Sequence, residues 1–421
     1  MSFQNKILII LKNYKNIFEN ILSLSILNFF NTIIPLIAIP YMIKVLGFEN
    51  FGIYSVFNTI IVYILLFTNF GFNISATKVV SINRINLNYI NLYFSSVLII
   101  RLILTFLSIF LLFIITFFIH SLNFNLCLYS LGILIADIFI PIWFFQGQEQ
   151  MKYITILYSI QKILFTIFIF VFIKEKNSYP IIFLINSITM LFLSLVAILI
   201  LYKKFKIRFL IPQFDFIKDV FKSSKRYFLT TLGITFYRNI NILVLGFTNS
   251  NFDTGIYAAS EKIVKSFQSI VFPFTNAIFP YYSFTFTNNN LKTNIKLLEK
   301  VTILYFIIFL FFNTILFIFS KYISNIVVKE HIYYSTILIR IMSFVILFGG
   351  LNYLLGIVGL INLGYENKFN KSVFYTAIIN IILIFVLSYY YSFYGAAISF
   401  TLSELFLFIL LFFNIYKLKR N

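Results

Sequence analysis

The sequence predicts an all-α integral membrane protein with about twelve transmembrane helices in two pseudo-symmetric lobes of six. Three observations support this fold class: an apolar composition, apolar blocks long enough to cross a bilayer, and a repeat at half the chain length. Of 421 residues, 61% are hydrophobic and 11% are charged, and the mean hydropathy is +0.95. Soluble domains of this length do not have such a composition.

The apolar blocks define the predicted helices. Each block has roughly 20 or more mainly apolar residues, enough to cross about 30 Å of hydrocarbon at about 1.5 Å per residue. An even number of spans places both termini on the same side of the membrane. We predict helices at about 17–45, 51–78, 90–119, 123–146, 151–173, 179–202, 224–246, 253–283, 297–321, 332–361, 370–391 and 393–416.

The basic residues of the connections alternate between a rich side and a poor side, which sets the orientation. The rich side has Lys6, Lys12, Lys15, Lys78, Arg84, Lys152, the run from Lys203 to Arg226, Lys292, Lys296, Lys300, Lys368, Lys371, Lys417, Lys419 and Arg420. The poor side has Lys44, Lys174, Lys176, Lys321 and Lys329. Both termini are therefore predicted to be cytoplasmic. Because the net charge of +20 is dispersed over many short loops, it does not favour nucleic-acid binding.

A short motif is repeated about 200 residues apart. Leu46-Gly47-Phe48 precedes Gly52-Ile53-Tyr54-Ser55, and Leu245-Gly246-Phe247 precedes Gly255-Ile256-Tyr257-Ala258. Gly147-Gln148-Glu149 and Gly364-Tyr365-Glu366 each follow the fourth apolar block of their half. In a membrane protein such a repeat is typical of a transporter with its substrate site between the halves. We predict an N-terminal lobe at 1–202, a basic cytoplasmic linker at 203–223 and a C-terminal lobe at 224–421.

The linker is the longest cytoplasmic connection. It contains Lys203, Lys204, Lys206, Arg208, Asp215, Lys218 and Asp219. We expect a solvated segment whose basic side chains also touch anionic lipid headgroups.

Ionisable residues within the predicted spans are the candidate functional residues. Most lie roughly 12–20 Å from the nearest helix start, near the bilayer midplane, where a charge costs at least about 2.5–3.5 kcal/mol and needs water or a partner. The basic candidates outnumber the acidic ones, so the interior suits an anionic substrate. The candidate substrate contacts are Arg238, Lys262, Arg340, Arg101, Lys162 and Lys265, and the candidate ion couplers are Asp137, Glu261 and Glu404.

Each candidate also has a structural explanation. Glu261 and Lys265 are four residues apart and could form an ion pair on one helix. Arg101 and Lys162 could pair with Asp137. Arg238 and Arg340 could bridge helices. Among the basic residues we rank Arg238, Lys262 and Arg340 first as substrate contacts.

Other chemistry has little support in the sequence. The single cysteine, Cys127, lies in an apolar block and the chain has two histidines, so we predict no metal site. A Gly-x-x-x-x-Gly-Lys-Ser/Thr loop is absent, which argues against ATP hydrolysis by this chain. We predict a transporter and not an enzyme.

Three stretches of the chain carry recognisable motifs. They are Ile39-Pro40-Tyr41 through Gly52-Ile53-Tyr54, Trp143-Phe144-Phe145-Gln146-Gly147-Gln148-Glu149 through Tyr153, and Gly255-Ile256-Tyr257-Ala258-Ala259 through Pro273 to Pro280. Together they resemble the O-antigen and polysaccharide-repeat flippases, the Wzx-type members of the multidrug/oligosaccharidyl-lipid/polysaccharide (MOP) exporter superfamily. The resemblance implies the MATE-like fold, with two six-helix lobes around a central cavity.

The resemblance also implies a substrate and a location. Wzx-type flippases move undecaprenyl-diphosphate-linked oligosaccharides from the cytoplasmic to the periplasmic leaflet of the bacterial inner membrane by alternating access. The implied energy source is antiport of protons or sodium ions, with no cofactor. The implied protein partners are a polysaccharide polymerase and a chain-length regulator.

Rival functions remain open. A multidrug exporter would share the fold but have a less basic cavity, and a lipid II flippase usually has fourteen helices. A flippase for capsule or teichuronic-acid units would differ only in its substrate. An O-antigen polymerase or membrane glycosyltransferase would have a large outward loop or an acidic motif there, and the chain has neither.

Overall fold

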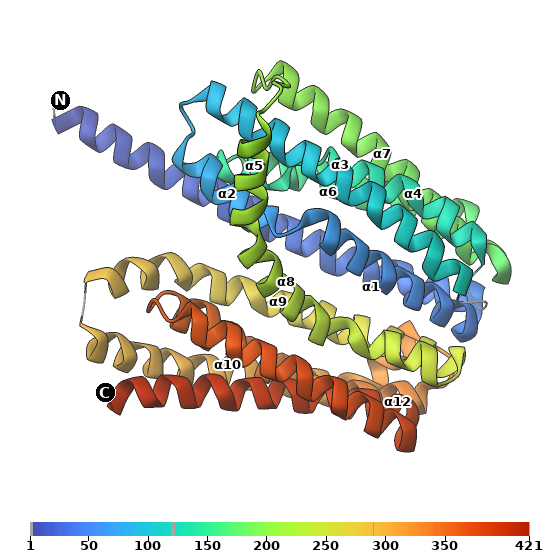
Figure 1. Cartoon of the computed structure of the whole chain (residues 1–421). Coiled ribbons are helices and arrows are strands. Elements are labelled where there is room, and N and C mark those ends of the chain that lie inside the picture. Colours follow the sequence, from blue (N-terminus) through green and yellow to red (C-terminus); the bar gives the residue numbers. More distant parts are fainter. Residues whose placement is uncertain (1–2, 119–122, 289, 421) are drawn as a thin grey trace. The chain divides into compact units, whose positions relative to one another are not determined.

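The computed structural model describes residues 3–118, 123–288 and 290–420, and all of its regular elements there are helical (Figure 1). The predicted end of the third helix, residue 119, lies outside this part. The helices are α1 (Phe3–Asn69), α2 (Phe72–Ile82), α3 (Leu87–Phe118), α4 (Phe124–Ile138), α5 (Ile142–Gly147), α6 (Met151–Phe172), η1 (Lys176–Ser178), α7 (Tyr179–Lys203), α8 (Phe214–Thr248), α9 (Asn251–Asn288), α10 (Leu291–Val327), α11 (Ile332–Tyr353), η2 (Leu354–Ile361) and α12 (Glu366–Arg420). Within the described ranges, nine helical segments are long and apolar enough to cross a membrane. The protein is therefore a multi-pass, all-helical membrane protein.

Two of the long helices are each a pair of helices joined at a kink. Gly47 has φ 74° and ψ 168° inside α1, and Ser392 has φ 47° and ψ −129° inside α12. A Cβ on Gly395 would overlap the carbonyl oxygen of Leu387, so the two halves of α12 need glycine at this tight turn. These kinks lie where the sequence predicts a break between the first two helices and between the last two.

Several predicted boundaries are wrong. The helix predicted at 123–146 is broken into α4 and α5 before Pro141, because proline removes a backbone hydrogen bond. Helix α8 begins at Phe214, ten residues before the predicted start at 224, and α10 begins at Leu291 instead of 297. Charged residues near these starts, such as Asp215 and Lys218 in α8 and Lys292 in α10, interrupt the apolar pattern, so hydropathy alone does not find the starts.

The chain forms two compact units. The first contains 1–34, 60–174 and 178–232, and the second contains 35–59, 175–177 and 233–421. Helices α1 and α8 contribute residues to both units. The predicted lobes at 1–202 and 224–421 remain a prediction.

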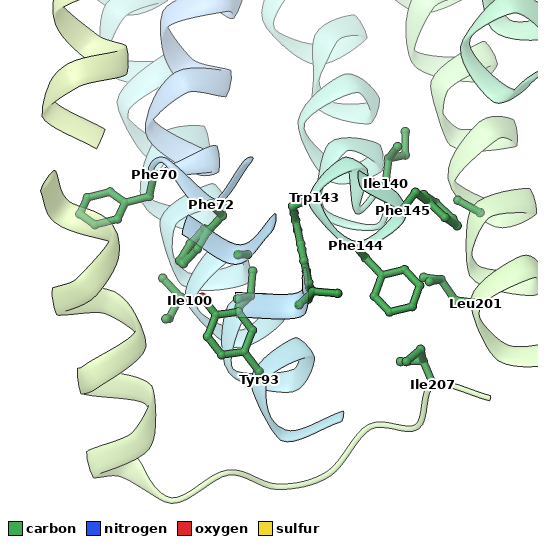
Figure 2. Packing of buried hydrophobic residues seen from close by; sticks show 14 of the residues in the cluster. Phe70, Phe72, Tyr93, Ile100, Ile140, Trp143, Phe144, Phe145, Leu201 and Ile207 are labelled. Atoms are coloured by element: carbon green, nitrogen blue, oxygen red, sulfur yellow. The ribbon is translucent and has the colours of Figure 1, made fainter. Parts of the chain in front are cut away.

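An aromatic cluster forms the core of the first unit. Trp143, Phe144 and Phe145 of α5 are at most 2% exposed and pack with residues of α2, α3, α6 and α7 (Figure 2). A Cβ on Gly147 would lie 2.6 Å from the Cβ of Val80, which explains the glycine at the α2–α5 crossing. Trp143, Phe144, Phe145 and Gly147 therefore have a packing role in this unit.

Helix α11 forms the core of the second unit. It packs against α9, α10 and α12, and Leu338, Ile339, Met342, Val345 and Ile346 are fully buried. It continues into a π-helix, η2, whose wider turn also lies in the core. Such π-helical turns are rare and occur often at functional sites.

The two copies of the sequence repeat contact each other within the second unit. A Cβ on Gly52 would overlap the carbonyl oxygen of Asn251, and one on Gly255 would overlap the carbonyl oxygen of Phe48. Phe48 precedes Gly52 by four residues, as Asn251 precedes Gly255. The contact is therefore reciprocal, as a two-fold axis between two related segments would produce.

Candidate functional site

A polar network crosses the second unit, and Arg238 lies at its centre. Arg238 on α8 is half-buried, and its Nη2 donates a 2.9 Å hydrogen bond to Oε1 of Gln268 on α9. Gln268 is 2% exposed and donates in turn to the carbonyl oxygen of Val345 on α11 (3.4 Å). Arg238 therefore bridges α8 and α9, which is the structural role that the sequence analysis considered for it. Its remaining N–H donors lie near the pocket described below.

Lys265 and Glu261 form the expected ion pair on α9, with Nζ 3.2 Å from Oε2. Lys265 also donates to the carbonyl oxygen of Arg238 (3.2 Å) and to Oδ1 of Asn239 (3.3 Å). The Tyr257 hydroxyl donates to the other carboxylate oxygen of Glu261 (3.3 Å). Lys265 and Arg238 thus share one network, and Glu261 balances one of the two positive charges.

Glu404 on α12 is a buried carboxylate, 1% exposed. Asn352 on α11 donates from Nδ2 to Oε2 of Glu404 (2.7 Å) and to its carbonyl oxygen (2.9 Å). Among the residues that the structure describes, Oε1 of Glu404 and Oδ1 of Asn352 have no hydrogen-bond partner. Arg238 and Lys265 are close enough to attract the carboxylate electrostatically. Glu404 therefore keeps one acceptor oxygen for another group.

Arg238, Asn352 and Glu404 line one open pocket in the second unit. Its polar lining comes from Tyr237, Arg238, Asn352 and Glu404, and the rest is mainly apolar side chains of α8, α11, η2 and α12. A site with a few convergent polar groups in an apolar wall is typical of a binding pocket.

Lys262 lies on a neighbouring face of α9. Its Nζ is 5.0 Å from the ring centre of Phe51 and 4.8 Å from that of Tyr54, both in the second half of α1. A cation over two aromatic rings gains roughly 0.5–2 kcal/mol. Lys262 therefore contacts the repeat motif of α1.

Arg340 lies apart from the pocket. It is exposed on α11, its Nε donates to Oγ of Ser320 (3.0 Å), and its guanidinium lies 5.4 Å from the ring centre of Phe317 on α10. Arg340 thus bridges α10 and α11, the structural role that the sequence left open.

The other candidates lie in the first unit. Arg101 on α3 is 2% exposed and forms an ion pair with Asp137 on α4, while its Nη1 donates to the carbonyl oxygen of Ile138 (3.4 Å). Lys162 is half-buried on α6, and the ion pair of Asp137 is with Arg101. Of the two pairings considered from the sequence, the structure forms the one with Arg101.

The candidate residues predicted from the sequence are all charged, so they do not include the neutral amides of the network. Gln268 and Asn352 hold the charged groups, and Asn380 donates to the carbonyl oxygen of Tyr237 (2.7 Å) and to Oδ1 of Asn241 (3.2 Å). All of these amides are at most 5% exposed. A search of the apolar blocks for Asn and Gln, in addition to charged residues, would have found them.

Two further expectations concern a metal site and the stretch that contains Pro273 and Pro280. In the described ranges, no group of three or more His, Cys, Asp and Glu side chains could hold a metal ion. The side chains of 270–289, which include Pro273 and Pro280, lie outside the described residues.

Curated relatives match almost the whole chain. A protein of Escherichia coli (strain K12) named "Putative O-antigen transporter" is 25% identical over 392 residues, which cover 92% of this chain and 93% of that protein. A protein of Shigella dysenteriae with the same name is 23% identical over 269 residues, 63% of this chain and 67% of that protein. Both are named as transporters and not as enzymes.

Solved structures show the fold. An inward-facing multidrug resistance transporter of the MATE family, from the MOP superfamily, superposes with a TM-score of 0.76 at 13% identity, covering 93% of this chain and 96% of its own. The lipid II flippase MurJ in an inward closed conformation superposes with a TM-score of 0.74 at 14% identity, covering 94% and 89%. The chain thus shares its overall fold with these transporters.

The family match covers more than half of the chain. Residues 17–286 match the family described as polysaccharide biosynthesis protein. This span includes the motif that ends at Tyr54, the motif that begins at Trp143, and both copies of the Gly-Ile-Tyr repeat. The chain is a membrane transporter that belongs to the polysaccharide biosynthesis protein family.

Proposed function

We propose that this protein is a flippase that moves an undecaprenyl-diphosphate-linked oligosaccharide, an O-antigen or related repeat unit, from the cytoplasmic to the periplasmic leaflet. The observation that carries the proposal is the pocket in the second unit that Arg238 lines on α8, in a chain of this family. A sugar headgroup cannot cross hydrocarbon cheaply, because its hydroxyls would lose their hydrogen bonds. A polar pocket within the membrane-spanning helices can replace those bonds.

The chemistry of Arg238 fits a diphosphate. A planar guanidinium binds phosphate oxygens through two parallel hydrogen bonds, whereas lysine acts as a point charge. Lys262 and Lys265 on the next helix would add positive charge. Arg340, Arg101 and Lys162 remain weaker candidates, because Arg340 lies away from the pocket and Arg101 is paired with Asp137.

The topology is part of the same proposal. Twelve spans result when α1 and α12 each count as two helices and α2, α5, η1 and η2 are counted with their neighbours in sequence. We propose two six-helix lobes, both termini in the cytoplasm, the bacterial inner membrane as location, and alternating access. A polysaccharide polymerase and a chain-length regulator are the proposed protein partners.

The test is the leaflet position of lipid-linked units in cells that lack the gene. Radiolabelled units should stay inaccessible to a membrane-impermeant glycosidase added to spheroplasts, and the intact gene should restore access. Arg238→Ala should lower the flipping rate roughly 10- to 100-fold, because a charge-assisted hydrogen bond contributes about 1.5–3 kcal/mol. The rate of Arg238→Lys should fall between that of Arg238→Ala and that of the wild type. Arg420→Ala, at an exposed position in the last turn of α12, is the matched control.

Two outcomes would contradict the flippase. Single units that reach the periplasm but do not lengthen would indicate a polymerase. Normal glycan together with altered drug sensitivity would indicate a multidrug exporter.

We further propose that Glu404 couples transport to a proton or sodium gradient. Asp137 and Glu261, the other candidates, are ion-paired with Arg101 and Lys265, whereas Glu404 keeps one oxygen without a hydrogen-bond partner among the described residues. Glu404→Gln preserves the size of the side chain and its bond from Asn352 but removes the charge. In proteoliposomes with an imposed gradient, the variant should transport at a rate that no longer responds to the gradient.

The matched control for this coupling test is Glu299→Gln, since Glu299 is exposed and pairs with Lys419 on the surface. A Glu404→Gln protein whose rate follows the gradient as the wild type does would exclude Glu404 as the coupler.

A further inference from the structure

The connection between α7 and α8 is fixed to the first unit. Its Phe205 packs edge-on against Phe144 (5.1 Å between ring centres) and against Tyr153 (5.8 Å). Ile207 is 7% exposed and belongs to the buried aromatic cluster, where Figure 2 shows it beside Leu201 and Phe144. The expectation of a solvated linker is therefore wrong for these two side chains.

The backbone of this connection is held along α3. The amide of Arg208 donates to Oδ1 of Asn91 (3.1 Å), and the amide of Leu210 donates to Oγ of Ser95 (2.9 Å). Asn91 and Ser95 are 6% and 0% exposed and lie one helical turn apart. Residues 204–214, which we call the strap, thus have one side that packs against the first unit and one side that faces away from it.

The outer side of the strap combines large apolar residues with basic ones. Phe209 is 58% exposed, Ile211 is 89% exposed, and Phe214, the first residue of α8, is 76% exposed. Lys206 and Arg208, which precede Phe209 in the chain, are also exposed. The bonds along α3 hold these apolar side chains outward, so they cannot fold into the core of this unit.

The neighbouring loop has the same character. Ile85, between α2 and α3, is 98% exposed, and Tyr89 at the start of α3 contacts Phe216 of α8 (5.9 Å between ring centres). Between residues 203 and 222 the basic side chains outnumber the acidic ones, with Lys203, Lys204, Lys206, Arg208, Lys218 and Lys222 against Asp215 and Asp219. An exposed apolar patch flanked by lysine and arginine is complementary to an anionic membrane surface.

We propose that the strap is a membrane-surface anchor, in which Phe209, Ile211 and Phe214 insert among the anionic phospholipid headgroups of the bilayer that surrounds the helices. Lys206 and Arg208 bind the phosphates. The strap joins the last helix of the first unit to α8, which has residues in both units. The anchor ties this connection to one leaflet, whatever lipid-linked substrate is transported.

Tryptophan fluorescence in nanodiscs tests this anchor. The single tryptophan, Trp143, is 2% exposed, so wild-type protein supplies an unquenched baseline. Phe209→Trp and Ile211→Trp should each add a signal that brominated phosphatidylglycerol quenches strongly. Phe205→Trp, on the packed side of the same strap, is the matched control and should be quenched little.

The charge dependence tests the headgroup contact. At equal mole fraction, brominated phosphatidylglycerol should quench Ile211→Trp more than brominated phosphatidylcholine does. Adding Lys206→Ala should lower that preference about fivefold, since one basic residue near an anionic surface contributes about that factor.

Three results would overturn the anchor. Tryptophans at 209 and 211 that acrylamide quenches and brominated lipids do not would place the strap in water. Tryptophans that neither reagent quenches would place this face against protein. Equal quenching by the two brominated lipids would exclude recognition of anionic headgroups.

Discussion

Asp137→Ala is expected to lower the free energy of unfolding by about 3–5 kcal/mol, because it leaves the buried guanidinium of Arg101 without its carboxylate. Arg101 is 2% exposed, and its Nε already lacks a hydrogen-bond partner among the described residues. With Asp137 removed, Arg101 would keep, within the described part of the chain, the long hydrogen bond from its Nη1 to the carbonyl oxygen of Ile138. Denaturant titration of purified protein in detergent micelles would measure the loss.

The double variant Arg101→Met/Asp137→Leu separates charge from packing. Replacing both partners of a buried ion pair with apolar residues is often neutral or stabilising, so stability should return towards the wild-type value. Asp215→Ala, in the exposed first turn of α8, is the matched control and should change the free energy of unfolding by at most about 1 kcal/mol. An Asp137→Ala protein of normal stability that has lost transport would instead identify Asp137 as a coupling residue.

Gly52→Val is the second substitution with a large expected effect. Its Cβ would overlap the carbonyl oxygen of Asn251, a backbone atom that moves only if α9 moves. Overpacking of this kind typically costs about 1–3 kcal/mol, and the β-branched side chain adds strain in a helix. We expect a lower midpoint of thermal unfolding, measured by fluorescence-detected size exclusion after heating.

Gly233→Ala is the matched control for the glycine contact. The nearest atom to its Cβ would be Cγ1 of Val373 at 3.5 Å, an ordinary contact, and alanine favours a helix over glycine by up to about 1 kcal/mol. This variant should be as stable as the wild type or more so. Gly255→Val should behave as Gly52→Val does, because the two contacts are reciprocal. If Gly52→Val matched the control, the crossing of the two repeats would be excluded.

Local features of the chain were predictable because they depend on residues near in sequence. The apolar blocks located most helices, and the four-residue spacing located the ion pair between Glu261 and Lys265. The sequence does not locate helix starts where charged residues interrupt the apolar pattern, as after Phe214 and Leu291. Hydropathy indicates whether a segment lies in lipid or in water. It does not indicate the hydrogen bonds with which a helix begins.

The polar network could not be predicted in the same way. Arg238 meets Gln268 across 30 residues, and Asn352 meets Glu404 across 52. The helical period shows which side chains share a face but not which helix covers that face. For the same reason Arg340, one of our first three candidates, belongs to a contact between α10 and α11 and not to the pocket.

The sequence by itself determined the all-helical membrane class, the positions of most helices, the repeat and the resemblance to the family, because composition and motifs are properties of the chain. Tertiary structure alone decided that Glu404 bonds Asn352, that the repeats cross at Gly52 and Gly255, and that the strap packs on α3. Each of these contacts joins helices or segments far apart in sequence. Their partners are fixed by close packing and by the need to pair buried polar groups, which act only once the helices are assembled.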